Sequence, residues 1–427
     1  MNRTSCLNSS AFFLGVVVAI VVAIMLGSSV YTVPAQAAAH QTSIAASDAP
    51  KNNKVYAPLI VNDVNPLLAT RIGYGTTLSN LGQYSKVREL NAGWYVNWLT
   101  SANPSRPGGI EYVQMLRVHQ KTTCGSRKTP NRITCPYKEP QAYEFGLAGE
   151  LGQPQVASIA AKNPGSTWLI GNECDRMDWD KGGQDEILPE LYARAFHEAR
   201  RWIKTADPTA KIAICGVIQP TPLRLQYLTI VWDTYKALYG VDMPVDIWNT
   251  HAFIIREKST LQPIDPTTDE YLENWGAGIP PGIIATQGEY PNDCFAANAY
   301  CPHVDMTVFD KQIRAFRSWM KARNQENKPL IVTEYGVLYY WLPYSDNQAF
   351  MLETFDYFLN EKDCVLSSVD GCRLVQQWAW FSLDNLDDSE RHPHVLYNEK
   401  TNQILSLGNQ YADFVEENLA KLKNYQP

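Results

Sequence analysis

Short apolar segments alternate with amphipathic segments from about Arg71 to the C-terminus. Eight apolar runs have the length of strands, and helical patterns separate most of them. The predicted strands are Arg71–Thr76, Ala92–Trp98, Tyr112–His119, Thr167–Glu173, Lys211–Val217, Val245–Phe253, Leu330–Tyr335 and Leu374–Phe381. The clearest predicted helices are Leu188–Ala206, Pro222–Tyr239, Thr307–Gln325, Asn347–Glu361 and Asn409–Lys423, whereas the connection between the second and third strands is poorly marked. This alternation indicates an α/β fold, and eight strands favour a closed (β/α)8 TIM barrel over an open doubly wound sheet.

Two connections are long. Gln120–Pro140 follows the third predicted strand, and Ile254–Asp305 follows the sixth. Both leave the carboxyl ends of strands, the face on which barrel enzymes build their active sites. Long connections in a compact domain are often functional. We therefore predict a single catalytic domain, residues 67–427, with long loops after strands three and six.

The N-terminus has the pattern of a targeting segment. Arg3 precedes the apolar run Ala11–Leu26, and Ala35-Gln36-Ala37 resembles a signal-peptidase site. We predict a signal peptide over residues 1–37 and a flexible linker over residues 38–66. The run is only slightly shorter than the roughly 20 residues of a membrane span, so an uncleaved signal anchor is the alternative. The protein is accordingly expected to be secreted, or anchored at the outer face of the membrane.

Eight cysteines follow the targeting segment, an even number in an exported chain. Closeness in sequence favours three disulfides, Cys124 with Cys135, Cys294 with Cys301, and Cys364 with Cys372. Cys174 and Cys215 fall at the ends of neighbouring predicted strands, where they are either bonded or simply buried thiols. No cysteine or histidine spacing resembles a zinc site, and we predict neither a metal nor a cofactor.

Charge and aromatic content limit the class of ligand. The 427-residue chain has a net charge of −7 and a pI near 5.6, so nothing draws it to nucleic acid or anionic lipid. It contains 12 Trp and 23 Tyr, most of which we expect in the core, although some can stack on the faces of sugar rings. We expect a monomer that binds carbohydrate and contacts a membrane only through its N-terminal segment, if this is not cleaved.

Two predicted strands end in a carboxylate. The fourth strand runs into Asn172-Glu173, and the seventh runs through Thr333-Glu334. In a barrel these strand ends face each other across the mouth. Two facing carboxylates are what glycosidic cleavage requires, since one donates a proton to the leaving oxygen while the other attacks the anomeric carbon. We expect the acid to have a raised pKa, the nucleophile to stay ionised, and the two groups to lie roughly 5 Å apart.

These segments resemble those of the clan A retaining barrel glycosidases, such as family 5 cellulases and mannanases and family 39 xylosidases. The resemblance implies that Glu173 is the acid/base, that Asn172 contacts the hydroxyl next to the anomeric carbon, and that Glu334 is the nucleophile. His251, at the end of strand six, matches a His or Tyr near the nucleophile, and Trp380, at the end of strand eight, matches a Trp beneath the sugar. The chain departs from the pattern at Cys174, where many relatives have Pro.

Other residues near the strand ends are further candidates. We expect substrate contacts from some of the aromatic residues Trp94, Trp98, Tyr335 and Trp179, with Trp275, Tyr339, Tyr340 and Trp341 as further positions. Arg71 and Arg117 lie on strands, where each either binds the nucleophile or forms a structural ion pair. Asp175, Asp178 and Asp180 do not match a calcium loop and are expected to be solvated.

The sequence therefore predicts a secreted retaining glycoside hydrolase that cleaves β-glycosidic bonds of oligo- or polysaccharides by double displacement. The alternative is a catalytically inactive carbohydrate-binding barrel or cell-surface adhesion protein. Retention of both glutamates argues against it. A metal-dependent barrel hydrolase would need several strand-end ligands, of which only His251 is offered.

Overall fold

The computed structural model describes residues 68–124, 132, 135–176, 183–255, 257, 277–284, 303–338, 342–384, 394–423 and 425. Contacts divide the chain into Met1–Ile60 and Val61–Pro427, and every described residue belongs to the second unit. Several predictions therefore lie outside the described residues: the signal peptide and the linker, the Cys294–Cys301 pair, Asp178, Trp179, Asp180, Trp275, Tyr339, Tyr340 and Trp341. Among the described residues, no helix is long and apolar enough to cross a membrane.

The fold is α/β and is built on parallel strands. These are β1 (Ala69–Gly75), β2 (Ala92–Val96), β3 (Glu111–Tyr112), β4 (Gln114–Leu116), β7 (Thr167–Asn172), β8 (Lys211–Gly216), β9 (Trp248–His251), β10 (Leu330–Tyr335) and β11 (Gln377–Trp380). One sheet has the order β3-β2-β1-β11-β10-β9, and a second has the order β4-β7-β8. Only Val113 separates β3 from β4, and the parallel bridges Ala213–Ile247 and Val217–Thr250 join the β8 and β9 segments.

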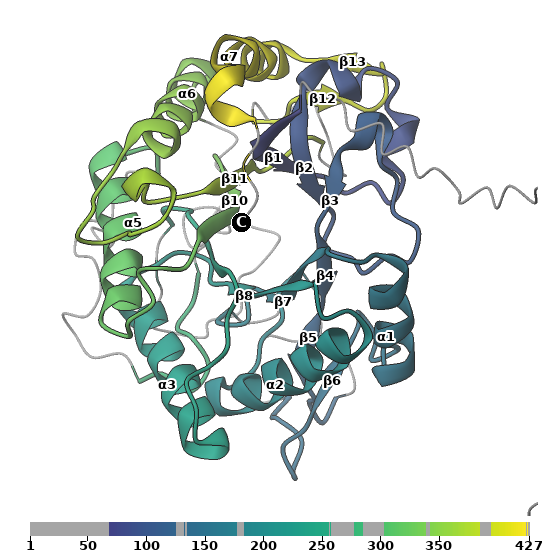
Figure 1. Ribbon diagram of the computed structural model, residues 1–427, viewed down its shortest axis with the longest axis vertical. Coiled ribbons are helices and arrows are strands. Elements are labelled where there is room, and N and C mark those ends of the chain that lie inside the picture. Colours follow the sequence, from purple (N-terminus) through teal and green to yellow (C-terminus); the bar gives the residue numbers. More distant parts are fainter. Residues whose placement is uncertain are drawn as a thin grey trace, which may run out of the picture. The chain divides into compact units, whose positions relative to one another are not determined.

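Helices lie outside these strands (Figure 1). They are α1 (Gln153–Lys162), α2 (Pro189–Ala206), α3 (Pro222–Tyr239), α5 (Met306–Lys321), α6 (Tyr344–Asn360) and α7 (Ser406–Leu422). Helices α2 and α3 begin with proline, whose fixed φ suits the first helical position. Asp305 caps α5 by accepting from the backbone of Thr307 and Val308. The residues between β2 and β3, all of them described, contain only the 3-10 turn η3 (Pro107–Gly109), in keeping with the absent helical pattern.

The third predicted strand is divided in the structure. Its last part, β5 (Val118–Gln120), leaves the parallel sheet and pairs antiparallel with β6 (Tyr143–Phe145). The hairpin continues through a bridge between Thr122 and Tyr137 and carries the Cys124–Cys135 disulfide. A second small hairpin joins β12 (Tyr397–Asn398) to β13 (Gln403–Ile404). Three more 3-10 turns are η1 (Leu81–Gln83), η2 (Val87–Leu90) and η5 (Asp370–Cys372).

Side chains on the two faces of the strands form separate cores. A smaller cluster draws one or two residues from every parallel strand segment except β1, counting β3 and β4 as one segment: Trp94, Val96, Val113, Met115, Leu169, Ala213, Ile247, Ile331 and Ala379. A larger cluster packs the opposite strand faces against the helices. Trp94 fills the smaller core, where it needs Gly73, because a Cβ on that glycine would lie 2.7 Å from the indole ring. The catalytic candidates lie beyond this core, at the carboxyl ends of the strands.

Candidate active site

Glu173 and Glu334 line one pocket at the carboxyl ends of β7 and β10. The pocket has a volume of about 350 Å³. Its lining residues are Trp98, Arg117, Asn172, Glu173, Arg176, Gly183, Gln184, Ile218, Phe253, Glu334, Leu338 and Phe381. They include three aromatic rings, two carboxylates and two side-chain amides, so the pocket offers both apolar faces and hydrogen-bonding groups.

Backbone irregularities turn both carboxylates toward this pocket. The chain leaves β7 with positive φ angles at Gly171 (90°) and Glu173 (46°), a conformation that L-residues seldom adopt. In β10 the register shifts between Val332 and Glu334 relative to β9. Such irregularities re-aim side chains and often lie beside functional sites. Both glutamates thus owe their direction to a departure from regular strand geometry.

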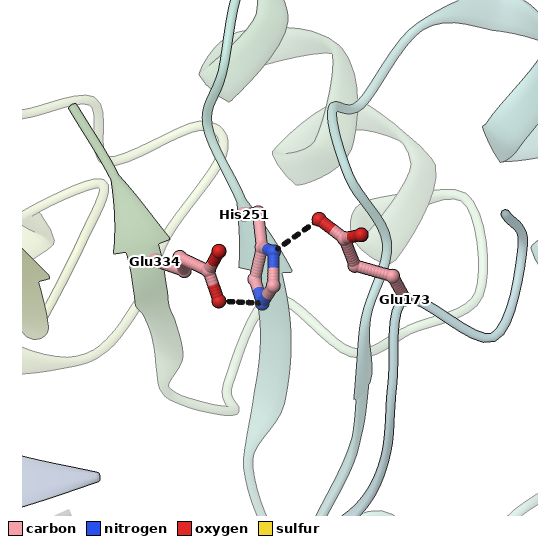
Figure 2. A group of neighbouring side chains, drawn as sticks. All are labelled: Glu173, His251 and Glu334. Atoms are coloured by element: carbon pink, nitrogen blue, oxygen red, sulfur yellow. Dashed lines mark hydrogen bonds and ion pairs between the residues drawn. The ribbon is translucent and has the colours of Figure 1, made fainter. Parts of the chain in front are cut away.

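His251 lies between the two carboxylates (Figure 2). Its Nδ1 is 3.2 Å from Oε1 of Glu173, and its Nε2 is 3.8 Å from Oε2 of Glu334. One atom from each of the three side chains can be chosen so that all lie within 4.8 Å of one another. The ring sits against Gly216 of β8, where a Cβ would lie 2.3 Å from Cδ2. A glycine at this position is therefore required for the histidine to occupy its place.

Each glutamate has a second partner. The indole N–H of Trp98 donates to Oε2 of Glu334 over 2.9 Å. The Arg176 guanidinium donates to Oε2 of Glu173 over 3.0 Å. Arg176 was not among the predicted site residues. Its position three residues after Glu173 is the only signal in the sequence that could have suggested it.

These contacts give the carboxyl groups opposite proton affinities. Burial acts to raise the pKa of Glu173, but Arg176 and His251 lower it more strongly, to about 2. The pKa of Glu334 is raised to about 7. Burial is the largest cause and the charge of Glu173 adds to it, while His251 and the Trp98 hydrogen bond offset these effects only in part. The pKa of His251 is also raised, because Glu334 and Glu173 outweigh the effect of burial. Glu173 is therefore the carboxyl group that is ionised at neutral pH, the reverse of the distribution that we expect for an acid and its nucleophile.

Asn172 presents an amide oxygen that has no partner among the described residues. Its backbone N–H donates to Asp185 over 2.9 Å, and its side-chain amide donates to the Gly183 carbonyl over 2.9 Å. Because the second bond fixes which amide atom is the nitrogen, the remaining Oδ1 is a buried acceptor. A ligand hydroxyl in the pocket could donate to it.

The predicted aromatic contacts divide into two groups. Trp98 lines the pocket, whereas Trp94 belongs to the inner core described above. Tyr335 packs against Phe309 and Phe358 of helices α5 and α6. Trp380 is fully buried against Tyr335, and its indole donates to the His394 carbonyl over 2.7 Å. For these three residues the structure provides packing positions, because they lie in the core or on the strand face opposite the pocket.

Phe253 and Phe381, which were not predicted as site residues, complete the aromatic wall. The Phe381 ring meets Trp98 edge to face at a centroid distance of 5.7 Å, and it meets Phe253 at 6.0 Å. Phe381 directly follows Trp380 in the sequence. Adjacent residues of an extended chain point to opposite faces, so the ring that reaches the pocket is one position later than the resemblance implied.

Both strand arginines form structural ion pairs, the second of the two alternatives. Arg117 pairs with buried Asp185 at 2.8 Å, and Arg71 pairs with Asp370 at 2.5 Å. Arg117 also borders the pocket. Its guanidinium donates to the Gly183 carbonyl, the group that also receives the Asn172 amide, so it helps to hold that amide in place.

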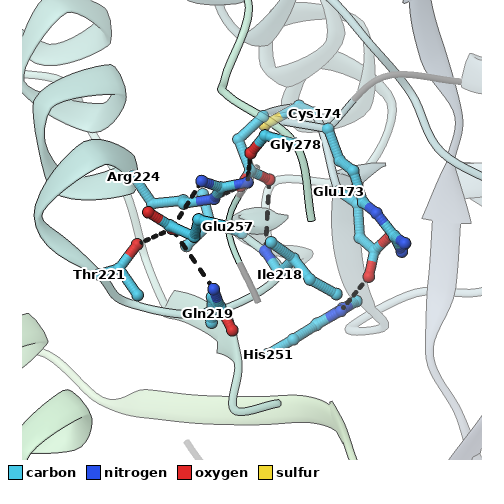
Figure 3. Close-up of polar contacts among 12 residues, drawn as sticks. Glu173, Cys174, Ile218, Gln219, Thr221, Arg224, His251, Glu257 and Gly278 are labelled. Carbon is cyan, nitrogen blue, oxygen red and sulfur yellow. Dashed lines mark hydrogen bonds and ion pairs between the residues drawn. The ribbon is translucent and has the colours of Figure 1, made fainter. Parts of the chain in front are cut away.

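A buried ionic network lies behind Glu173 (Figure 3). Arg224 of α3 lies 3.1 Å from Asp175 and 2.6 Å from Glu257, and none of the three side chains is exposed. Arg224 also donates to the Gly278 carbonyl. The prediction that Asp175 is a solvated loop acid is therefore wrong, because a guanidinium from α3 covers it. Burial raises the pKa of Asp175 to about 6, Arg224 lowers it in part, and Glu173 raises it further.

Three disulfides join described cysteines. Cys124–Cys135 and Cys364–Cys372 form as predicted. Cys174 is bonded to Cys215, which decides the alternative left open by the sequence. This bond ties the residue after Glu173 to the end of β8. It therefore adds a covalent support beside the acid/base candidate.

Glu173, His251 and Glu334 also offer atoms that a divalent cation could bind. The Arg176 guanidinium already neutralises Glu173, and the indole N–H occupies an oxygen of Glu334. These donors compete with a cation for the same lone pairs. The set is better suited to holding and exchanging protons.

Comparison with known proteins gives similarity in structure but not in sequence. No family model and no curated protein matches the chain. A glucosidase from Croceicoccus marinus is 12% identical with a TM-score of 0.46, over 82% of this chain and 68% of that one. A family 39 glycoside hydrolase from Bacteroides cellulosilyticus WH2 is 13% identical with a TM-score of 0.40, over 86% of this chain and 66%, just under two thirds, of that one. Cel5A from Thermotoga maritima in complex with cellobiose is 11% identical with a TM-score of 0.39, over 83% and 97%. Glycoside hydrolases are thus among the solved structures that this chain resembles.

Proposed function

We propose that this protein is a retaining glycoside hydrolase that cleaves β-glycosidic bonds of oligo- or polysaccharides. The observation that carries the proposal is the pair Glu173 and Glu334. They line one pocket, and two of their oxygens lie within 4.8 Å of each other. Retaining glycosidases need carboxyl groups about 5–5.5 Å apart, whereas inverting enzymes need about 6.5–9.5 Å to admit a water. The pocket geometry therefore favours direct attack by one carboxylate.

In the proposed reaction Glu334 attacks the anomeric carbon while Glu173 protonates the leaving oxygen. The resulting glycosyl ester on Glu334 is then hydrolysed by a water from which Glu173 removes a proton. The Trp98 indole orients the nucleophile, and Arg176 and His251 hold the acid/base. The same carboxyl of Glu173 serves both half-reactions, first as acid and then as base.

The other pocket residues suit a sugar ring. Trp98, Phe253 and Phe381 supply aromatic faces and edges for its C–H groups. The unpartnered Oδ1 of Asn172 can accept from the hydroxyl next to the anomeric carbon. A volume of about 350 Å³ lies at the lower end of the range for small-ligand pockets. These features support one sugar subsite in this pocket.

The proposal extends to the architecture and location of the chain. β3 and β4 are counted as one segment, and the two bridges between the β8 and β9 segments are included. Each parallel strand segment then has a parallel neighbour on either side, so we infer a closed (β/α)8 barrel. Three disulfides among the described cysteines suit an oxidising compartment. Together with the predicted signal peptide, they support secretion.

The decisive experiment combines a substrate screen with trapping. Chromogenic β-glucoside, mannoside, xyloside and galactoside substrates are tested first, followed by the matching 2-fluoro glycoside. We expect turnover by the wild type and a covalent adduct mapped by peptide mass spectrometry to Glu334. Glu173→Gln and Glu334→Gln should abolish turnover, while Glu353→Gln, on the exposed surface of α6, should not change it.

Three results would contradict the proposal. Inverted product stereochemistry would exclude the retaining mechanism. An adduct on Glu173 would reverse the two roles. Sugar binding without any turnover by the wild type, unaffected by Glu173→Gln, would instead support a carbohydrate-binding protein.

A further inference from the structure

His251 lies between the two proposed catalytic carboxylates and faces one with each ring nitrogen. Its Nδ1 reaches Glu173 at 3.2 Å and its Nε2 faces Glu334 at 3.8 Å (Figure 2). No hydrogen bond joins the two carboxyl groups directly in the described part of the chain. A proton that moves from one to the other without solvent therefore has to pass through the imidazole.

We infer that His251 is a proton relay that carries the proton of Glu334 to Glu173 when a sugar fills the pocket. This inference rests on the proposed function. It explains how a site in which Glu173 is the ionised carboxyl can reach the form that double displacement requires. His251 acts through the two carboxylates and is not itself placed against the sugar.

The position of the His251 ring supports a proton relay. His251 is 1% exposed, and its Nε2 has no hydrogen-bond partner among the described residues. A buried ring nitrogen without a partner is costly unless it is used. The 3.8 Å gap to Glu334 exceeds a hydrogen bond, but contacts of this kind commonly tighten once substrate is bound. The absence of a Cβ on Gly216 leaves room for the edge of the ring that carries Nε2.

The surrounding charges determine which of the two carboxyl groups holds the proton before the transfer. Glu334 faces His251 from β10, whereas Glu173 and Asp175 act on it from the segment after β7. Arg176, from the same segment, pairs with Glu173 and stabilises its carboxylate. The proton therefore rests on the Glu334 side of the imidazole, and the ring keeps its hydrogen on Nδ1, where Glu173 accepts it.

The relay step balances as a tautomer exchange. Oε2 of Glu334 gives its proton to Nε2 of His251, and Nδ1 gives its proton to Oε1 of Glu173. Glu334 becomes the carboxylate nucleophile, Glu173 becomes the neutral acid, and the imidazole is again neutral with its hydrogen on Nε2. Positive charge that develops at the anomeric carbon favours the ionised Glu334 and so favours transfer in this direction. The proton returns by the same route after the product leaves.

The test compares two leaving groups in His251→Gln. A dinitrophenyl glycoside loses its leaving group without protonation, whereas an unactivated alkyl glycoside needs the proton of Glu173. At pH 8, where Glu334 has already lost most of its proton to solvent, we expect glycosylation by the alkyl substrate to slow by roughly 10²-fold or more, the scale of catalysis by a positioned acid, while glycosylation by the dinitrophenyl substrate is largely kept. Imidazole added to His251→Gly should restore the alkyl reaction selectively. His197→Gln, on the outer helix α2, is the matched control and should change neither rate.

A second readout does not depend on activity. Side-chain ¹⁵N NMR follows the titration of His251, whose signal is assigned by its loss in His251→Gln. Glu173→Gln and Glu334→Gln should each lower the pKa of His251, because both carboxylates favour the imidazolium. Equal slowing of both substrates, or no slowing of either, would overturn the relay. A histidine titration that neither glutamate variant moves would also overturn it, even if the wild type cleaves no glycoside. Failure of the wild type in the substrate screen alone would count against the proposed function.

Discussion

Replacing Trp98 with Phe removes one hydrogen-bond donor from Glu334 and keeps an aromatic ring beside Phe381. The indole N–H lies 2.9 Å from the carboxyl oxygen and favours its ionised form. A hydrogen bond to a charged group contributes about 1.5–3 kcal/mol. Without it, Glu334 holds its proton more tightly, and its pKa moves above the value of about 7 by roughly one to two units.

Two measurable consequences follow, because Glu173 and Glu334 share one proton. The reactive form has this proton on Glu173, which is the minor arrangement. In Trp98→Phe that arrangement becomes rarer by roughly 10- to 100-fold, so kcat/KM for an unactivated glycoside falls by this factor at pH 5–6. The shared proton is lost as the pH rises through the higher pKa. The alkaline limb of the pH profile should therefore move up by roughly one to two units.

The assay is kcat/KM from pH 4 to 10, with Trp94→Phe as the matched control. Trp94 is on the same face of the chain, but its indole donates to the Arg71 carbonyl inside the core. We expect the control to lower the melting temperature and to leave the alkaline limb unchanged. A fall in kcat/KM for Trp98→Phe without a move of this limb would refute the reasoning, since it would mean that the indole acts only on the sugar.

Three further predictions concern the surroundings of the site. Gly216→Ala places a Cβ 2.3 Å from the His251 ring, and overpacking of this kind costs about 1–3 kcal/mol. We expect chemical denaturation to show this loss of stability, and we expect activity to fall as it does in His251→Gln. Burial lowers the pKa of His303 to about 4, so the unfolded chain, with a pKa near 6.5, binds its proton first as the pH falls. Between pH 7 and pH 5 the free energy of unfolding should therefore fall by about 2 kcal/mol more in the wild type than in His303→Gln. Urea unfolding of both proteins at the two pH values measures this, and an equal fall in both proteins would contradict it. Replacing both Cys174 and Cys215 with Ala opens a link with a sequence separation of 41; the chain-entropy model gives a loss of about 4 kcal/mol, which urea unfolding measures, and a loss below 1 kcal/mol would disprove a supporting role.

Periodicity was sufficient to place most elements. Helix α3 (Pro222–Tyr239) and strand β10 (Leu330–Tyr335) have the predicted bounds, because a proline or a polar turn marks their starts and a glycine follows each end. The division of the third strand was not predicted. Arg117-Val118-His119-Gln120 contains no glycine or proline where β5 turns away to pair with β6, and pairing with a distant segment leaves no mark on the local pattern.

The candidate site could be predicted only where the chemistry of a residue type was specific. Strict alternation from the inward-facing Ile331 would direct Glu334 outward, and the register shift in β10 corrects this. Sequence patterns do not reveal such a shift, although a carboxylate at a strand end did indicate the residue. Tyr335 was predicted by proximity and Trp380 by the resemblance. The register shift that turns Glu334 to the pocket turns Tyr335 to the opposite face, and alternation from the inward-facing Ala379 places Trp380 there.

The partners of the catalytic candidates come from positions that no local pattern connects. Arg224 reaches Asp175 from the first turn of α3, across a long separation in sequence. Arg176 was overlooked because an arginine in a loop is normally solvated. In both cases burial makes the contact decisive, and burial is a property of the folded chain.

The Arg224 network constrains how this molecule can diversify. Loops at the carboxyl ends of parallel strands are the parts that evolution and engineering exchange most freely. Here the segment after β9 supplies Glu257, and the segment after β7 supplies Asp175, to one buried guanidinium. If a graft replaces either segment and omits its carboxylate, the Arg224 guanidinium is left buried without that partner. The cost is about 3–5 kcal/mol. The two segments must therefore be transplanted as a pair, or with Arg224 replaced by an apolar residue of similar volume.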